Sequence, residues 1–182
     1  MRLLQGLLKL CARVCRAAMV YYYRGMLKSV GRGFRIGIGS TIVSPRNISV
    51  GDDCFFGPGL YVSSNEDVLI GNGVMCGPQV MILGGDHDFR TLGVPLRVAP
   101  SIGRPDAIVV EDDVWIGARC IILKGVRIGT GSIIGAGSIV TRSIPAYSVA
   151  AGAPCRVVRP RFSKEELDQH RQMLQRRLAE HA

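Results

Sequence analysis

Aliphatic residues recur every six positions through most of this chain. Between residues 108 and 141, the anchors of this period are Val110, Ile116, Ile122, Ile128, Ile134 and Val140. A second small or apolar residue lies two positions before each anchor. Because side chains alternate across a strand, this spacing indicates short strands, and a fixed period of six is typical of a parallel β-helix. An amphipathic helix would return apolar residues at three and four, and an antiparallel sandwich has no reason to keep the period.

The same period appears earlier in the chain, where Gly follows each of the anchors Ile38, Val50, Phe56, Ile70 and Cys76. Residues that tolerate a positive φ fall between the anchors, including Asp52-Asp53, Asn72-Gly73 and Asp112-Asp113. Three short strands separated by such corners close one triangular coil, and coils stack at roughly 4.8 Å. The pattern therefore predicts an all-β domain, a parallel β-helix over residues 36–160.

Two irregularities interrupt the period. Val62 and Ile70 are eight positions apart, so two extra residues bulge within residues 63–67, either as part of a site or as a tolerated insertion. Over residues 83–107 the period stops altogether. An insertion between coils leaves the solenoid as a loop, and a loop this long is usually functional.

The two ends of the chain read as helices. Residues 1–35 begin with Leu and Cys at helical spacing, while Lys9, Arg13 and Arg16 lie on another face. Two readings of residues 1–30 stay open: peripheral contact with a membrane surface, or packing against the prism or a neighbouring subunit. Residues 161–182 start with a capping box, Ser163 to Glu166, and the helix that follows is expected to cover the open end of the coil.

Composition limits the partners. The formal net charge of +9 over 182 residues favours a polyanion: nucleic acid, anionic lipid or a phosphate-bearing cofactor. Aromatic and basic residues do not interleave, so nucleic acid is not expected. The six cysteines form no CxxC pair and no zinc pattern, which predicts a reduced, cytoplasmic chain without a metal. No apolar run of 18 residues exists, so no transmembrane span is expected.

One histidine stands out among three. His87 lies in the protruding loop between Asp86 and Asp88, whereas His170 and His181 lie in the C-terminal helix and are expected at the surface. An imidazole titrates near neutral pH and can take a proton from a hydroxyl. From the residues alone, His87 is either a general base or a surface residue of a loop.

From Ile108 to Arg159 the chain closely resembles the hexapeptide-repeat acetyltransferases, and the matching text is VWIGARCIILKGVRIGTGSIIGAGSIVTRSIPAYSVAAGAPCRVVR. The similarity is greatest to the galactoside, maltose and nodulation-factor enzymes, and the Gly-Gly-Asp-His loop extends it. This resemblance implies a left-handed coil, a homotrimer, and acetyl-CoA bound between adjacent prisms. It also implies that His87 is the general base and that the backbone N–H of Ala118 stabilises the oxyanion.

The resemblance further assigns a cofactor site and an acceptor site. The cofactor-binding residues it implies are Trp115, Ala118, Ala136, Thr141, Arg142, Arg156 and Arg159. Trp115 would lie near the cofactor arm, although a core or interface position suits it equally. Ala136 would let the pantetheine pass, and the arginines would face phosphates. The acceptor-binding candidates are Asn65, Asp86 and Asp88.

The sequence thus predicts an acetyl-CoA-dependent O-acetyltransferase acting on a sugar hydroxyl, in surface polysaccharide or lipopolysaccharide biosynthesis. Its expected location is the cytoplasm, at the inner face of the membrane if residues 1–30 bind lipid. One alternative is an antibiotic acetyltransferase of the streptogramin or chloramphenicol type. Another is a non-catalytic trimeric scaffold or sugar-binding protein. A hydratase of the γ-carbonic anhydrase type would need three zinc-binding histidines, and the coil region contains only His87.

Overall fold

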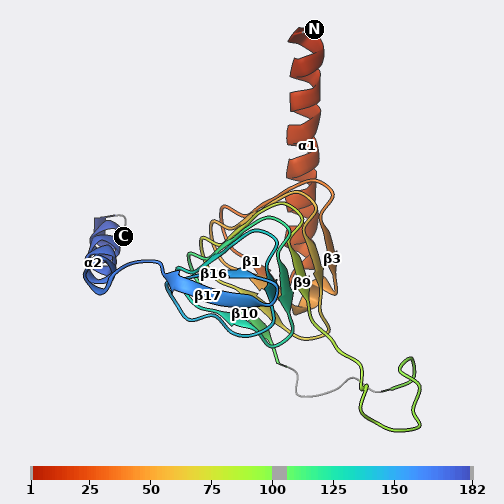
Figure 1. Cartoon of the computed structure of the whole chain (residues 1–182). Helices are drawn as coiled ribbons and strands as arrows, with labels where there is room; N and C mark the ends of the chain where they lie inside the picture. Colours follow the sequence, from red (N-terminus) through yellow and green to blue (C-terminus); the bar gives the residue numbers. More distant parts are fainter. Residues whose placement is uncertain (1, 100–105, 181–182) are drawn as a thin grey trace.

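The computed structural model describes residues 2–99 and 106–180 and shows a parallel β-helix with a helix at each end (Figure 1). The helices are α1 (Arg2–Met26), the short 3-10 helix η1 (Pro45–Asn47) and α2 (Lys164–Glu180). In this described part of the chain, neither long helix has the apolar character that crossing a membrane requires.

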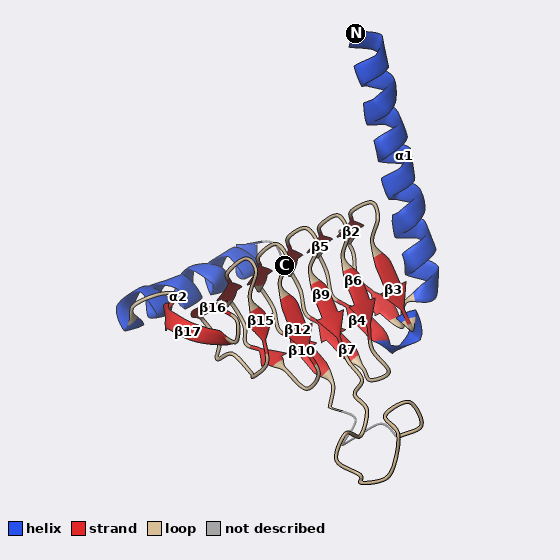
Figure 2. Cartoon of the chain, turned by 45° about the vertical axis from the view of Figure 1, so that its right-hand side comes forward, coloured by secondary structure: helices blue, strands red, loops and turns tan. Residues whose placement is uncertain are grey.

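Three sheets form the walls of the prism, with five, seven and five strands. Sheet A contains β1 (Ser29–Val30), β4 (Ile48–Val50), β7 (Val68–Ile70), β10 (Ile108–Val110) and β13 (Arg127–Ile128). Sheet B contains β2 (Arg35–Ile36), β5 (Phe55–Phe56), β8 (Met75–Cys76), β11 (Trp115–Ile116), β14 (Ile133–Ile134), β16 (Ser148–Gly152) and β17 (Cys155–Pro160). Sheet C contains β3 (Thr41–Val43), β6 (Tyr61–Ser63), β9 (Met81–Leu83), β12 (Ile121–Leu123) and β15 (Ile139–Val140). Each coil contributes one strand to each sheet in the order A, B, C (Figure 2).

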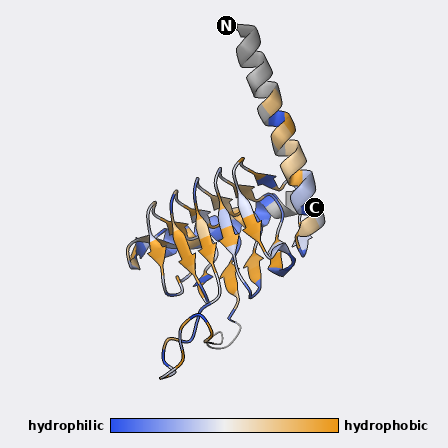
Figure 3. Cartoon of the chain, turned by 90° about the vertical axis from the view of Figure 1, so that its right-hand side faces the viewer, coloured by the Kyte–Doolittle hydropathy of each residue, from blue (hydrophilic) through white to orange (hydrophobic). Residues whose placement is uncertain are grey.

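The anchors of the period of six form the core, except Ile38, which lies at the turn after β2 and is 54% exposed; the inward residue of that strand is Ile36. Along sheet B, the register stacks buried inward side chains from successive coils on one another: Ile36, Phe56, Cys76, Ile116 and Ile134. Each fully buried aliphatic side chain stabilises the fold by roughly 1.5–3 kcal/mol. Figure 3 shows the hydrophobic strands of the wall that faces the viewer. The predicted parallel β-helix is confirmed by this arrangement.

Side chains at the corner between sheets A and B tie the coils together. Asp52 Oδ1 accepts a hydrogen bond from the Arg32 N–H (2.6 Å), and Asn72 Oδ1 accepts one from the Asp52 N–H (2.8 Å). Asp112 Oδ1 accepts one from the Asn72 N–H (2.6 Å). Asp53 follows with a φ of 54°, which Asp tolerates better than most residues. This corner is therefore closed by a ladder of side-chain to backbone hydrogen bonds.

The coil begins before residue 36. Strand β1 pairs in parallel with β4, so the first rung of sheet A falls inside the segment 1–35. Only two residues of β1 pair, and two residues are too few to reveal the period of six in the sequence.

The C-terminal end differs from the expectation in one respect. The capping box is confirmed: Ser163 N–H donates to Glu166 Oε2 (2.8 Å), and Glu166 N–H donates to Ser163 Oγ (3.2 Å). However, β17 turns back and pairs antiparallel with β16 in sheet B, and Figure 1 shows α2 beside the prism rather than over its open end. His170 of α2 is half-buried against the Phe162 ring (4.8 Å between centroids), so its surface assignment is wrong. His181 lies outside the described residues.

Candidate active site

The long insertion leaves the prism at the corner between sheets C and A. It follows β9 and rejoins the coil at β10, and its described part extends away from the prism (Figures 1 and 2). His87 lies near its start and is exposed, and the His87 backbone N–H donates to Asp86 Oδ1 (2.9 Å). The imidazole is thus accessible to a substrate.

Asp88 shapes the turn that follows His87. Its carboxylate accepts hydrogen bonds from the Arg90 N–H (2.8 Å), the Thr91 N–H (3.3 Å) and the Thr91 hydroxyl. The Thr91 hydroxyl and these backbone donors hold the pKa of Asp88 below its usual range. The carboxylate therefore stabilises the loop conformation, and its expected contact with the acceptor stays a prediction.

The bulge of residues 64–67 lies at the same corner, one coil below the loop. Asn47 Nδ2 donates to the Asn65 carbonyl (3.0 Å), which fixes the bulge against the coil before it. A Cβ at Gly85 would lie 3.5 Å from Asn65 Nδ2, so Asn65 lies beside the root of the loop that carries His87. The fold thus places this acceptor-binding candidate beside Gly85, two residues before His87.

Two residues at this root were not identified from the sequence. Glu66 Oε1 lies 3.4 Å from Lys124 Nζ, and the two side chains are 8% and 18% exposed. Glu66 Oε2 would lie 3.1 Å from a Cβ at Gly84, the first residue of the loop. A nearly buried ion pair therefore supports the insertion. Lys124 occupies a corner between regular repeats, so the sequence pattern gave no signal for this pair.

The corner between sheets B and C holds the two alanines of the predicted cofactor site. Ala118 and Ala136 stack on successive coils, where Gly137 N–H donates to the Ala118 carbonyl (2.8 Å). Among the hydrogen bonds of the described residues, the Ala118 N–H donates none. The equivalent positions one and two coils earlier are Pro78 and Pro58, which have no N–H. Among the described residues, the N–H groups of Ile38 and Ala136, at the same place in other coils, also donate no hydrogen bond, so Ala118 provides the first such amide after the two prolines.

Trp115 lies on the outer face of sheet B. Its neighbours in register are Met75 and Ile133, and its side chain is 51% exposed. The core alternative for Trp115 is therefore wrong. Phe55 continues the outward ladder beyond Met75 and is also partly exposed. A ligand or a neighbouring subunit can cover this apolar surface.

The predicted phosphate-binding residues are all exposed. Thr141 and Arg142 follow β15, whereas Arg156 and Arg159 lie on β17. Arg156 Nη1 donates to the Cys155 carbonyl (2.8 Å), and Arg159 Nη1 donates to the Pro160 carbonyl (2.9 Å). Within the described residues, no carboxylate forms an ion pair with these three arginines. Their charge is therefore available to an anion.

The fold separates the predicted site residues. His87, Asn65, Asp86 and Asp88 lie at the C–A corner, as do Thr141 and Arg142 farther along the prism, whereas Ala118 and Ala136 lie at the B–C corner and the remaining candidates lie on strands of sheet B. Sheet C separates the two corners of one prism. A single chain, in the conformation described, does not bring the imidazole to the Ala118 amide.

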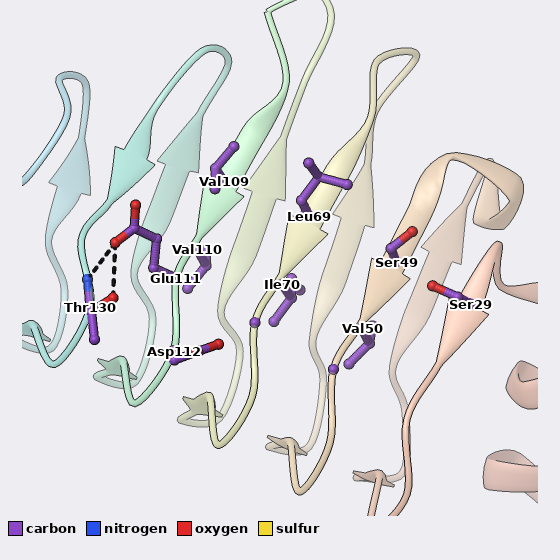
Figure 4. A pocket seen from close by; sticks show the side chains of 12 residues that line it. Ser29, Ser49, Val50, Leu69, Ile70, Val109, Val110, Glu111, Asp112 and Thr130 are labelled. Carbon is purple, nitrogen blue, oxygen red and sulfur yellow. Dashed lines mark hydrogen bonds between the residues drawn. The ribbon is translucent and has the colours of Figure 1, made fainter. Parts of the chain in front are cut away.

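A shallow hollow lies on the outer face of sheet A, lined by Ser49, Leu69, Val109 and Glu111 (Figure 4). Glu111 Oε2 accepts hydrogen bonds from the Thr130 N–H and hydroxyl, both at 2.9 Å, and Arg127 pairs with Glu111 Oε1 (2.7 Å). The Thr130 amide, together with Arg127, lowers the pKa of Glu111. This carboxylate is already saturated with donors, so we do not assign it a catalytic role.

Known proteins share this architecture. Residues 107–142 match the family described as bacterial transferase hexapeptide (six repeats). The galactoside O-acetyltransferase of Lactococcus lactis is 40% identical over 119 residues, which cover 60% of this chain and 54% of the relative. A maltose O-acetyltransferase from Clostridium difficile has 32% identity and a TM-score of 0.67, covering 76% of this chain and 72% of that chain. The chain belongs to the hexapeptide-repeat acetyltransferase family.

Other members of the hexapeptide-repeat acetyltransferases agree with this assignment. The galactoside O-acetyltransferase of Escherichia coli is 35% identical over 140 residues, or 77% of this chain and 57% of the relative. A Vibrio cholerae acetyltransferase of the family, solved with acetyl coenzyme A, aligns with a TM-score of 0.68 at 27% identity. Membership confirms the expected left-handed coil. This chain spans little more than half the length of the two galactoside enzymes.

Proposed function

We propose that this hexapeptide-repeat acetyltransferase moves an acetyl group from acetyl-CoA to a hydroxyl of a saccharide. The observation that carries the proposal is the Ala118 N–H, a half-buried amide that donates no hydrogen bond within the described residues. An amide of this kind can donate a hydrogen bond to the carbonyl oxygen that becomes negatively charged when a thioester is attacked. The printed names of the relatives, galactoside and maltose O-acetyltransferases, support a sugar hydroxyl as acceptor.

His87 would act as the general base. A nitrogen of its imidazole takes the proton of the acceptor hydroxyl, and the oxygen then attacks the carbonyl carbon of the thioester. The Ala118 N–H donates to the carbonyl oxygen while this oxygen carries negative charge. When the carbonyl re-forms, the carbon–sulfur bond breaks and the thiolate leaves. His87 returns the proton to the sulfur, so the products are an acetyl ester and a free thiol.

The exposed arginines would bind the phosphates of the co-substrate. Arg142, Arg156 and Arg159 have no carboxylate partners among the described residues, and guanidinium groups bind phosphate through two hydrogen bonds. The small side chains of Ala118 and Ala136 leave space along the B–C corner for a narrow chain such as pantetheine. The residues present therefore fit acetyl-CoA.

The catalytic site would form between two copies of the chain in a homotrimer. The imidazole and the Ala118 amide lie at different corners of one prism, so a neighbouring prism must supply one of them. The outer face of sheet C supports such contact, because Tyr61, Met81, Ile121 and Ile139 form an apolar ladder along it. A second prism packed against this face would bury that ladder.

The acceptor would lie over the C–A corner. Asn65, beside the loop root, can hydrogen-bond a hydroxyl through its amide, and Asp86 and Asp88 flank the base. We expect the acceptor to be a saccharide of surface polysaccharide or lipopolysaccharide synthesis. Asp88 already bonds Thr91, so Asn65 is the stronger candidate for acceptor recognition.

The test is thiol release from acetyl-CoA with a set of saccharide acceptors. We expect His87→Ala to lower kcat about 10²–10⁴-fold without changing the oligomeric state. His170→Gln is the matched control, since it removes another imidazole far from the loop, and we expect its turnover to stay near wild type. Near-normal turnover by His87→Ala would refute the base assignment. Release only with streptogramin or chloramphenicol acceptors would refute the saccharide assignment, and release with none would favour a scaffold.

A further inference from the structure

The net positive charge of this protein comes from one end of the chain. Residues 1–51 contain nine Lys and Arg residues and no Asp or Glu, while the remaining residues contain fourteen of each sign. The whole formal net charge of +9 therefore belongs to α1 and the first coil. The rest of the chain has no formal net charge. A positive field concentrated at one end favours binding to an anionic surface.

Helix α1 projects from the N-terminal end of the prism, as Figures 1 and 2 both show. Among its described side chains, those of its last part anchor it to the prism. Tyr23 is buried and donates from its hydroxyl to the Ser40 carbonyl (3.1 Å), and Met19 and Val20 pack partly against the core. The prism therefore holds α1 by one end and leaves most of its length uncovered.

The uncovered part carries an apolar stripe. Val14 is 60% exposed and Tyr22 is 57% exposed, and Cys11 and Ala18 are also exposed. At 3.6 residues per turn, the positions 11, 14, 18 and 22 fall on one face of a helix. Tyr23 and Leu27, which are buried, fall on the opposite side. The stripe therefore faces away from the prism.

The sequence continues this amphipathic pattern toward the start of the helix. Leu4, Leu7 and Leu8 continue the spacing of three and four residues that leads to Cys11. Lys9 and Arg13 fall on the opposite face of the helix. A helix with an apolar face, a purely cationic polar face and no acidic residue has the composition of an interfacial helix.

We propose that α1 docks lengthwise on an anionic lipid surface, with its apolar stripe at the acyl boundary and its cations beside the phosphates. A second copy of α1 is a poorer occupant, because it would cover the apolar stripe but supply no carboxylate to neutralise the cations. Anionic headgroups supply that neutralisation, at roughly 1 kcal/mol for each Lys or Arg near the surface. The proposal is independent of the acetyl-transfer chemistry.

Vesicle flotation with the full-length chain tests the proposal. We expect binding to vesicles of equimolar phosphatidylcholine and phosphatidylglycerol, weak binding to pure phosphatidylcholine, and a loss of binding as NaCl is raised. Val14→Asp should lower the partition coefficient about tenfold or more, because it places a charge in the apolar stripe. Arg13→Glu should lower it roughly tenfold or more by reversing one charge. Arg176→Glu, the same change on α2, is the matched control and should change it about twofold or less.

Three outcomes would overturn the proposal. Equal binding to the two kinds of vesicle would exclude a role for the cations, and absence of flotation would exclude docking itself. If Val14→Asp instead reduced the mass measured by light scattering, the stripe would be a contact between copies of the chain. Thiol release with a soluble acceptor should be unchanged in Val14→Asp. A failure of docking is therefore distinguishable from a failure of the proposed activity.

Discussion

Removing the charge of Glu66 is expected to destabilise the protein more than removing the imidazole of His87. Glu66 Oε1 lies 3.4 Å from Lys124 Nζ at the root of the loop, with 8% and 18% of the two side chains exposed. Glu66→Gln keeps the shape of the side chain and removes the carboxylate that pairs with a nearly buried ammonium. Breaking a fully buried pair costs about 3–5 kcal/mol. Because Lys124 keeps some access to water, we expect about 2–4 kcal/mol.

This cost is large enough to measure by thermal unfolding. For a chain of this size, 1 kcal/mol corresponds to roughly 2–4 °C in Tm, so Glu66→Gln should unfold about 5–15 °C below wild type. His87 is exposed, so His87→Ala should unfold within about 1 °C of wild type despite its loss of activity. The two variants thus separate stability from chemistry.

A double-mutant cycle identifies the ion pair as the cause. Replacing both partners of a buried pair with apolar or neutral groups is often close to neutral, so Glu66→Gln combined with Lys124→Met should recover most of the lost stability. If the double variant lost the sum of the two single effects, the charges would not interact. If Glu66→Gln unfolded at the wild-type temperature, the reasoning from burial would be refuted.

Three further predictions follow from the structure. Cys11 and Cys15 are exposed, so they should react quickly with a thiol reagent. Burial raises the pKa of Cys76 and should delay its reaction until the protein unfolds. Fast labelling of more than two thiols would contradict this prediction. The lowered pKa of Glu111 stabilises the fold above a pH of about 4.5, and this contribution is lost as pH falls through the lowered value. Tm measured against pH should therefore show wild type losing its advantage over Glu111→Gln in acid, and a constant gap would argue against it. Arg156→Ala should raise KM for acetyl-CoA several-fold more than KM for the acceptor in steady-state assays, and an unchanged cofactor KM would exclude the phosphate role.

The period of six predicted the prism and its interruptions because every anchor except Ile38 is an inward side chain. The strands near the two ends were harder to predict. Strand β17 carries no period, because Cys155–Pro160 is an antiparallel return along β16 rather than a further coil. Helix α2 was expected to cover the end of the prism, but its mostly charged and polar residues offer little apolar surface for packing. The sequence also located His87 in a loop, yet it contained no signal for the ion pair that supports this loop.

Insertions accumulate at one corner for a physical reason. The A–B corner is tied by carboxylate and amide side chains to the backbone of the coil before it, so an extra residue there would break a ladder that spans several coils. The B–C corner repeats a turn with positive φ at Gly59, Gln79 and Arg119. The described residues of the C–A corner form no such repeated ladder, and three successive coils insert η1, the 64–67 bulge and the long loop there. Length variation is tolerated where no interstrand ladder must be kept. A coil of this kind can therefore acquire a substrate-selecting loop without losing its core, which explains why the candidate acceptor residues lie at this corner, apart from the regular corner that holds the amide.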